Sequence, residues 1–263
     1  WSHLECAIAG KLSRTPVELH LHEENEPDFL GRVRQVAVRW SAAAIAVSND
    51  VRDSLPESVR GQVTVIANGV DPDQTTPGPA DPALRAEISD GNPEAPLVLS
   101  ASRLDPRKGV QFVIEAVASL FDEVPGIRLA VAGSGSLDPE FAAELEALAE
   151  KVAKGRVKFL GHRSDIDDLF RAADVMGMAS SLEGMPLGVL EAQAAGLPVV
   201  STPLPEVQLY ERLANVAAGR TNLLLGSPQA LTAKPARIGE TCVPLPCKAR
   251  LGREKCNRLR AAS

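Results

Sequence analysis

Between residues 97 and 201 the chain alternates short apolar runs with longer amphipathic segments, and this alternation constrains the fold more than any other feature. The apolar runs have the length of buried strands and lie at 97–102, 127–132, 157–160, 175–179 and 197–201. Helices are predicted between them at 109–124, 138–154, 164–173 (capped by Ser164) and 187–195. Parallel strands need helical crossovers. The pattern therefore predicts a doubly wound parallel sheet with ligands at the carboxyl ends of its strands.

The first 70 residues repeat this logic in a shorter run. Strands are predicted at 17–21, 43–47 and 63–66, with helices at 27–41 and 48–55, the second capped by Ser48. Three strands are too few for an open α/β domain, and the chain begins with Trp1 rather than Met. We therefore expect an N-terminally truncated chain with an incomplete first domain at 1–72.

The rest of the chain divides by composition. Six prolines between residues 71 and 96 favour a linker at 73–95, which includes a short helical stretch at 83–88. A second domain is expected at 96–207. Residues 208–263 have weak apolar periodicity, and we expect an atypical, poorly ordered tail there.

Composition and charge exclude several classes of protein. With 44% hydrophobic and 24% charged residues, wholesale disorder is excluded, and no apolar run is long enough to span a bilayer. Residues 1–210 carry a net charge of −13, which argues against a nucleic-acid-binding core. Residues 211–263 carry +7. Such a tail could contact RNA or an anionic membrane, although its composition favours a disordered segment without that role.

Four cysteines bear on the cellular compartment: Cys6, Cys242, Cys247 and Cys256. The spacing of the three cysteines in the tail is not that of a standard zinc site, and no histidine lies near them in the sequence. We expect reduced thiols and a cytoplasmic protein, with the inner face of the membrane as an alternative location.

Two motifs carry candidate chemistry. Arg103 and Lys108 lie between a strand and a helix, where two cations and free backbone N–H groups would hold a diphosphate. Solvated surface cations are the alternative interpretation. Glu183 and Glu191 lie on either side of the start of the helix predicted at 187–195, and carboxylates suit ribose or sugar hydroxyls. There the alternative is a capped helix with incidental acids.

Three further motifs are weaker. The sequence Gly133-Ser-Gly135 lacks the third glycine of a dinucleotide-binding loop, which favours a tight turn instead. His20 and His22 end a strand, so a histidine that faces a cleft and a structural role are both open. The acidic run from Asp165 to Asp168 is explained by a helix N-terminus, so no metal site is expected.

The order and spacing of these motifs resemble the donor-binding domain of a family 4 glycosyltransferase with the GT-B fold. The resemblance lies in the segments 101–109, 132–135, 159–161 and 180–201, and it extends more loosely to 46–48 and 65–71. It implies two Rossmann-like domains, of which 1–72 is the incomplete acceptor side and 96–207 the donor side. It also implies a nucleotide-diphospho-sugar donor, a glycan, lipid or small-molecule acceptor, transfer with retention, and no cofactor or metal.

The resemblance also implies roles for individual residues. Arg103 and Lys108 match the pair that holds the donor diphosphate, and Glu191 matches the glutamate that binds ribose. Glu183 matches the glutamate at the donor sugar, and His22 falls where the family often has a histidine of the N-terminal domain. The remaining residues expected at the donor are Gly133, Gly184, Met185, Leu187 and Gly188.

Some positions depart from the family pattern and leave alternatives. Pro186 removes one N–H donor, and Pro203-Leu-Pro-Glu206 replaces the expected Gly-Gly turn. The glycine-rich loop near the N-terminus and the terminal crossing helix are not found. The alternative to an enzyme is a non-catalytic remnant that binds nucleotide-sugars. A nicotinamide-dependent dehydrogenase is a third hypothesis, which the missing glycine after Gly135 opposes.

Overall fold

The computed structural model describes residues 2–71, 73–204 and 223–224, and the chain forms two compact units. Unit 1 comprises Trp1–Gly69 and Glu183–Leu187, and unit 2 comprises Val70–Leu182 and Gly188–Ser263. Apart from residues 223–224, the tail expected at 208–263, including Cys242, Cys247 and Cys256, lies outside the described residues. Cys6 is exposed and its thiol is free.

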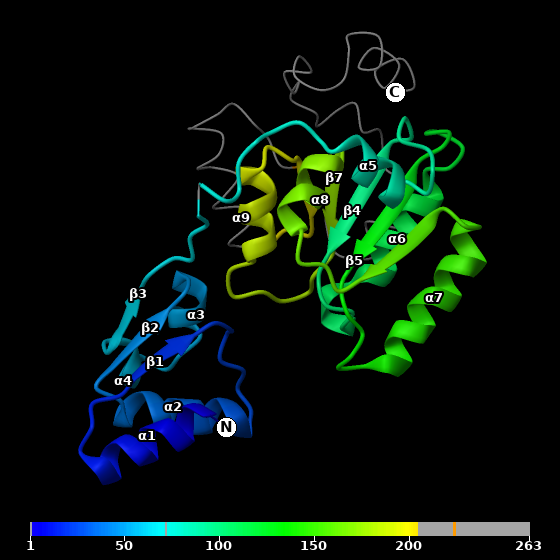
Figure 1. Cartoon of the computed structure of the whole chain (residues 1–263). Coiled ribbons are helices and arrows are strands. Elements are labelled where there is room, and N and C mark those ends of the chain that lie inside the picture. Colours follow the sequence, from blue (N-terminus) through cyan, green and yellow to red (C-terminus); the bar gives the residue numbers. More distant parts are fainter. Residues whose placement is uncertain (1, 72, 205–222, 225–263) are drawn as a thin grey trace. The chain divides into compact units, whose positions relative to one another are not determined.

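Unit 1 is a small α/β layer whose three parallel strands follow one another in chain order, β1-β2-β3 (Figure 1). Its elements are α1 (Ser2–Ser13), β1 (Glu18–Leu21), α2 (Phe29–Trp40), β2 (Ala43–Ala46), α3 (Asn49–Asp53), α4 (Glu57–Arg60) and β3 (Val63–Val65). Ser48 caps α3 as predicted, since its hydroxyl accepts the Val51 N–H at 3.1 Å. The sequence did not show α1, because this helix buries only Ala7 and Gly10 and so lacks a broad apolar face.

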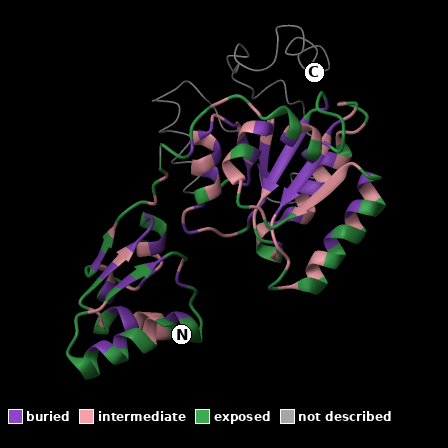
Figure 2. Cartoon of the chain, viewed as in Figure 1, coloured by how far each residue is buried: buried purple, intermediate pink, exposed green. Residues whose placement is uncertain are grey.

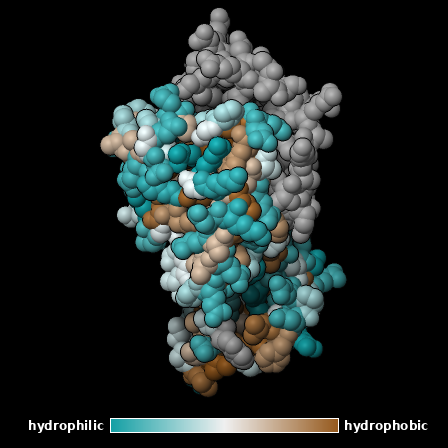
Figure 3. Space-filling view, turned by 90° about the vertical axis from the view of Figure 1, so that its right-hand side faces the viewer, coloured by the Kyte–Doolittle hydropathy of each residue, from teal (hydrophilic) through white to brown (hydrophobic). Residues whose placement is uncertain are grey.

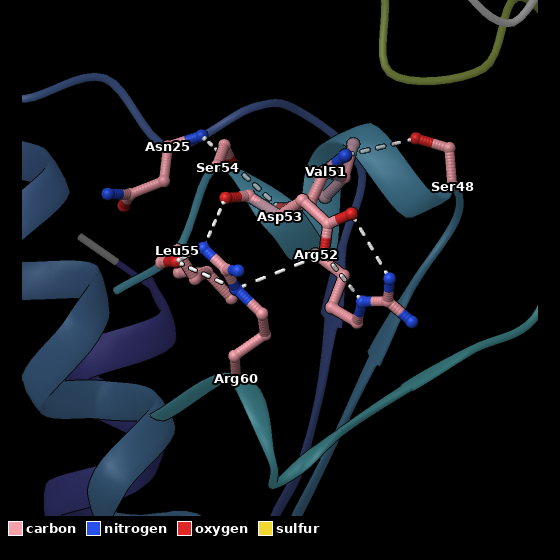
Figure 4. A network of polar contacts seen from close by, with 8 residues as sticks. All are labelled: Asn25, Ser48, Val51, Arg52, Asp53, Ser54, Leu55 and Arg60. Atoms are coloured by element: carbon pink, nitrogen blue, oxygen red, sulfur yellow. Dashed lines mark hydrogen bonds and ion pairs between the residues drawn. The ribbon is translucent and has the colours of Figure 1, made fainter. Parts of the chain in front are cut away.

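Polar contacts tie the loops of unit 1 together (Figure 4). Arg60 donates to the carbonyl oxygens of Asp53 and Leu55, each at 2.8 Å from Nη2. The Ser54 hydroxyl accepts the backbone N–H of Asn25 at 2.8 Å and so joins the segment after β1 to the end of α3. These bonds supply backbone groups in irregular segments with the partners that burial requires.

Apolar side chains remain on the surface of unit 1. Among the large exposed hydrophobic residues are Ile8 and Leu12 of α1 and Phe29, Leu30, Val36 and Trp40 of α2. Figure 3 shows apolar side chains gathered at the lower end of its view.

Unit 2 is the larger sheet, with six parallel strands in the order β6-β5-β4-β7-β8-β9. Its strands are β4 (Leu97–Ala101), β5 (Arg128–Ala132), β6 (Val157–Gly161), β7 (Val175–Met178), β8 (Val199–Ser201) and β9 (Leu223–Leu224). Its helices are α5 (Pro82–Ile88), η1 (Pro106–Lys108), α6 (Val110–Ser119), α7 (Pro139–Ala153), α8 (Ile166–Ala172) and α9 (Leu187–Ala194), of which Leu187 itself belongs to unit 1. The strand β9 lies beyond residue 207, where the donor domain was expected to end.

The core of unit 2 explains why its strands and helices could be predicted from the sequence. Leu99 and Leu129 lie in the sheet with no exposed surface, and Ile114 and Leu145 of the covering helices are equally buried. Figure 2 shows β4 and β5 as buried strands. A strand covered on both faces reads as a continuous apolar run, which is the pattern seen at 97–102 and 127–132.

One predicted helix start is wrong. Ser164 does not cap α8, because the helix begins at Ile166 and Asp165 occupies the cap position. The carboxylate of Asp165 makes no cap hydrogen bond and instead accepts two hydrogen bonds from Arg163, at 2.8 and 2.6 Å. The pairing of Asp165 with Arg163 thus replaces the side-chain cap that was expected from Ser164.

Candidate functional site

A cavity of about 210 Å³ opens in unit 2 at the carboxyl ends of β4, β5 and β6. It is lined by Ala101, Ser102, Arg103, Ala132, Gly133, Ser134, His162, Arg163, Ile166, Phe170, Gly188 and Glu191. The strand order places β4 between β5 and β7, so the crossovers run to opposite sides of this strand. Doubly wound sheets bind ligands in the crevice that such a reversal creates.

The end of β4 brings Arg103 to the cavity. The Ser102 N–H donates to the Ala132 carbonyl at 3.0 Å, and the Leu104 N–H donates to the Ser134 carbonyl at 3.2 Å. Leu104 is buried, whereas Arg103 is exposed. Its guanidinium forms no hydrogen bond or ion pair within the described part of the chain. This positive charge is therefore available to an anionic ligand group.

Gly133 allows two strand ends to approach each other closely. A Cβ at this position would stand 1.8 Å from the carbonyl oxygen of Ser102, inside any van der Waals limit. The Gly133 N–H also donates to the Gly161 carbonyl at 2.8 Å. Glycine is required here by backbone packing at the cavity wall. The tight turn predicted for Gly133-Ser-Gly135 lies further along the chain, at residues 136–137.

Helix α9 contributes the candidate carboxylate Glu191. This side chain is half-buried, and desolvation by burial raises its pKa, with a further contribution from the negative charge of Asp167. Asp167 is itself held in place, because the hydroxyl of buried Thr75 donates to its carboxylate at 2.7 Å. A partly desolvated carboxylate at a cavity wall is suited to accept hydrogen bonds from hydroxyl groups.

Sequence reasoning missed Arg163 and His162, which also line the cavity. Arg163 is bound to Asp165, as described above, and its Nη1 donates to Glu87 at 2.7 Å. These hydrogen bonds lower the pKa of Asp165 and raise that of Arg163. In the sequence, both residues lie just after the strand predicted at 157–160, and this position was their signal. The acidic run from Asp165 to Asp168 beside them was interpreted as a helix N-terminus instead.

The turn that carries Lys108 packs against the segment that follows β7. Gly109 has φ of +67°, and a Cβ there would stand 2.1 Å from the carbonyl oxygen of Ala179. The Ser181 N–H donates to the Arg107 carbonyl at 2.9 Å. Lys108 ends η1 and is not among the residues that line the cavity. The structure thus fixes the backbone around Lys108 without placing its side chain at the cavity wall.

The remaining predicted site residues belong to unit 1. They are His22, Glu183, Gly184, Met185 and Leu187. Gly184 packs on the backbone after β1, since a Cβ there would stand 1.9 Å from the His22 carbonyl oxygen. The Asn68 side chain donates to the Met185 carbonyl at 3.2 Å. The structure therefore brings Arg103, Gly133, Gly188 and Glu191 to one cavity, and Gly184 to the backbone of His22.

No group of three or more His, Cys, Asp or Glu side chains within the described ranges is placed to hold a metal ion. No helix in the same part of the chain combines the length and the apolar character needed to cross a membrane.

Comparison with known families decides the classification. Residues 95–239, more than half of the chain, match the family model described as glycosyl transferases group 1. The chain belongs to the group 1 glycosyl transferases. This membership confirms the resemblance drawn from the sequence motifs and leaves the dehydrogenase hypothesis without support.

Relatives of this group 1 glycosyl transferase share its sequence over most of its length. It is 35% identical to the D-inositol 3-phosphate glycosyltransferase of Streptomyces avermitilis over 219 residues, which cover 78% of this chain and 46% of the relative. It is 33% identical to the enzyme of that name from Stackebrandtia nassauensis over 223 residues, covering 79% and 48%. The chain spans less than half the length of these relatives.

Solved structures show the same fold. A crystal structure of Anabaena HepE in complex with UDP-glucose aligns with a TM-score of 0.74 and 26% identity, covering 88% of this chain and 64% of HepE. Sucrose-phosphate synthase from Thermosynechococcus elongatus aligns with a TM-score of 0.68 and 22% identity, covering 97% and 67%. These likenesses confirm the predicted α/β fold of GT-B type.

Proposed function

We propose that this group 1 glycosyl transferase binds a nucleotide-diphospho-sugar donor in the unit 2 cavity and transfers its sugar to an acceptor with retention. The observation that carries the proposal is the cavity at the β4 reversal, with the half-buried Glu191 in its wall and with Arg103, whose guanidinium has no ion pair among the described residues. The likeness to HepE, whose crystal structure holds UDP-glucose, supports a donor of this class.

The cavity residues divide the work of binding and catalysis. Arg103 stabilises the negative charge that develops on the leaving diphosphate, with Lys108 on the neighbouring turn as the second cation. Glu191 accepts hydrogen bonds from ribose hydroxyls. Because these cations take the part of a divalent metal, the proposed reaction needs no metal cofactor.

The residues proposed to act on the transferred sugar are Glu183 and His22. Glu183 meets the sugar, and His22 serves as a cleft histidine of the N-terminal domain. A contact made equally in the ground and transition states changes KM, whereas a contact made in the transition state changes kcat. Glu191→Gln should therefore raise the donor KM, and Glu183→Gln should lower kcat.

The proposed acceptor is a glycan, a lipid or a small molecule. We also propose that the protein contacts a membrane surface. The alternative function is a remnant that binds the nucleotide-sugar without transferring the sugar, and a binding experiment followed by an activity experiment separates the two.

The first experiment is calorimetric titration with UDP and GDP, with and without EDTA. We expect binding of at least one nucleotide that EDTA leaves unchanged. Loss of all binding in EDTA would contradict the metal-free site, and absence of binding in every condition would contradict the donor site itself.

The second experiment follows the anomeric proton by NMR while UDP-sugars are consumed. An α-linked donor should give an α-linked product, as retention requires. Consumption with inversion would contradict the proposed stereochemistry, and tight binding without any turnover would favour the non-catalytic remnant.

A further inference from the structure

An ionic cluster lies at one wall of the cavity and joins it to the helix before the sheet. Arg163 lines the cavity, and its side chain is only 22% exposed. Its Nε and Nη2 donate to the two carboxylate oxygens of Asp165, and its Nη1 donates to Glu87 Oε1 at 2.7 Å. Glu87 belongs to α5 and does not line the cavity.

The cluster limits what Arg163 can offer a ligand. A guanidinium carries five N–H donors, and three of those of Arg163 are used by the two carboxylates. At most two donors remain for a ligand. Asp165 and Glu87 balance the charge of Arg163 and that of Lys158, whose ammonium lies 2.6 Å from the Glu87 carbonyl oxygen, so this wall of the cavity offers a phosphate no net positive charge. Arg103 also lines the cavity but forms no ion pair within the described residues, so its positive charge is not compensated there.

This charge difference orients the proposed donor. The diphosphate is attracted to Arg103, and the uncharged nucleoside is the part that suits the Arg163 wall. A guanidinium held along its edges presents a fixed flat face and two N–H groups, which suits a nucleobase or ribose better than a mobile side chain would.

Helix α5 is a firm support for Glu87. Arg85 of the same helix donates to the Ala95 carbonyl at 2.7 Å, to the Ala172 carbonyl, and to Asp174 at 2.7 Å. The Lys158 ammonium of β6 donates to the backbone carbonyl of Glu87 at 2.6 Å. An exposed ion pair alone fixes little, but one built on an anchored backbone loses less entropy when it forms.

We propose that Glu87 is a positioning residue of the nucleotide site, which acts from α5 by holding Arg163 against the nucleoside part of the donor. The inference rests on the proposed function, because it needs a nucleotide in the unit 2 cavity. It goes beyond that function by giving the segment before the sheet, expected from the sequence to be a linker, a share in ligand recognition.

The test is a double-mutant cycle on the full chain with uridine and UDP as probes. Dissociation constants are measured for the wild type, Glu87→Ala, Arg163→Ala and the double variant. We expect Glu87→Ala to weaken uridine and UDP by the same factor of about fivefold, the range of one weakened hydrogen-bond contact. In the Arg163→Ala background, Glu87→Ala should have no further effect.

A matched control separates positioning from general stability. Asp90 follows α5 and pairs with Arg128 at 3.1 Å, at the amino end of β5 and away from the cavity-lining residues. Asp90→Ala should leave both dissociation constants unchanged. Glu87→Gln keeps an acceptor for Arg163 and should bind more tightly than Glu87→Ala, so it also serves if the alanine variant does not fold.

The outcomes distinguish the two proposals. If the wild type binds UDP but Glu87→Ala still weakens binding in the Arg163→Ala background, Glu87 does not act through Arg163 and the inference fails. An effect on UDP alone, or an equal effect of Asp90→Ala, overturns it as well. If the wild type binds neither probe, the proposed function fails, and the inference falls with it.

Discussion

The two units use the same strand and helix alternation but order their strands differently. In unit 1 the strands follow chain order, β1-β2-β3, so each crossover moves in one direction. In unit 2 the first strand, β4, lies inside the sheet, and later strands are added on both of its sides. The cavity of unit 2 lies at the end of this strand. The comparison teaches that the reversal of strand order, rather than the alternation itself, creates the crevice for a ligand.

The largest expected effect comes from the two cores. Leu129 of β5 and Leu21 of β1 are almost fully buried, and truncation of each to alanine should cost about 2–5 kcal/mol of unfolding free energy. Both tryptophans lie within the first 40 residues, so their fluorescence reports on the N-terminal part of the chain. In urea, Leu21→Ala should shift the fluorescence transition and Leu129→Ala the circular dichroism transition. A joint shift of both signals in either variant would show that the units unfold as one.

The next effect sharpens the assignment of the cavity to a diphosphate. Arg103→Ala should weaken UDP binding roughly ten- to a hundredfold, the value of a hydrogen bond to a charged group, while uridine binding stays unchanged. Lys108→Ala should show the same split. Arg128→Ala is the control, because Arg128 begins β5 at the end opposite the cavity. Equal losses for uridine and UDP would place these cations away from the phosphates.

A smaller effect tests the close approach at the cavity wall. Gly133→Ala would force a Cβ onto the Ser102 carbonyl and should cost about 1–3 kcal/mol of unfolding free energy. Gly61 of unit 1 has no atom within 4 Å of such a Cβ and has φ of −65°. Gly61→Ala should therefore stay within about 0.5 kcal/mol of the wild type. Similar costs for both variants in denaturant titrations would contradict the packing argument.

The smallest effect concerns the charge of Glu191. Because its pKa is raised, the folded state holds this proton more tightly than the unfolded chain, and ionisation at higher pH lowers stability. Glu191→Gln should raise Tm slightly at about pH 8 and leave it unchanged at about pH 3, below the ordinary glutamate pKa, where the carboxyl is protonated in both the folded and the unfolded state. Glu5→Gln, at an exposed position of α1 in unit 1, is the control. A lower Tm of Glu191→Gln at the higher pH would contradict the desolvation of Glu191.

The sequence by itself determined the elements and part of the site. Apolar periodicity located β4 to β8 and the helices between them, and the spacing of Arg103, Gly133 and Glu191 placed all three at strand ends or helix starts. These features depend on neighbours within one or two helical turns or one strand, so local rules suffice. These rules missed α1 because this helix buries only Ala7 and Gly10 and so shows no apolar period.

Only the tertiary structure decided which of these elements meet. The pairing of β4 with both β5 and β7, the addition of β9 to β8, and the contact of Glu87 with Arg163 all join segments far apart in the chain. The pair of Arg163 and Asp165 at the start of α8 is local, but its link to Glu87 of α5 is a contact of this long-range kind. Such contacts are selected by packing and by the charge of distant side chains, and the local sequence pattern carries no record of either.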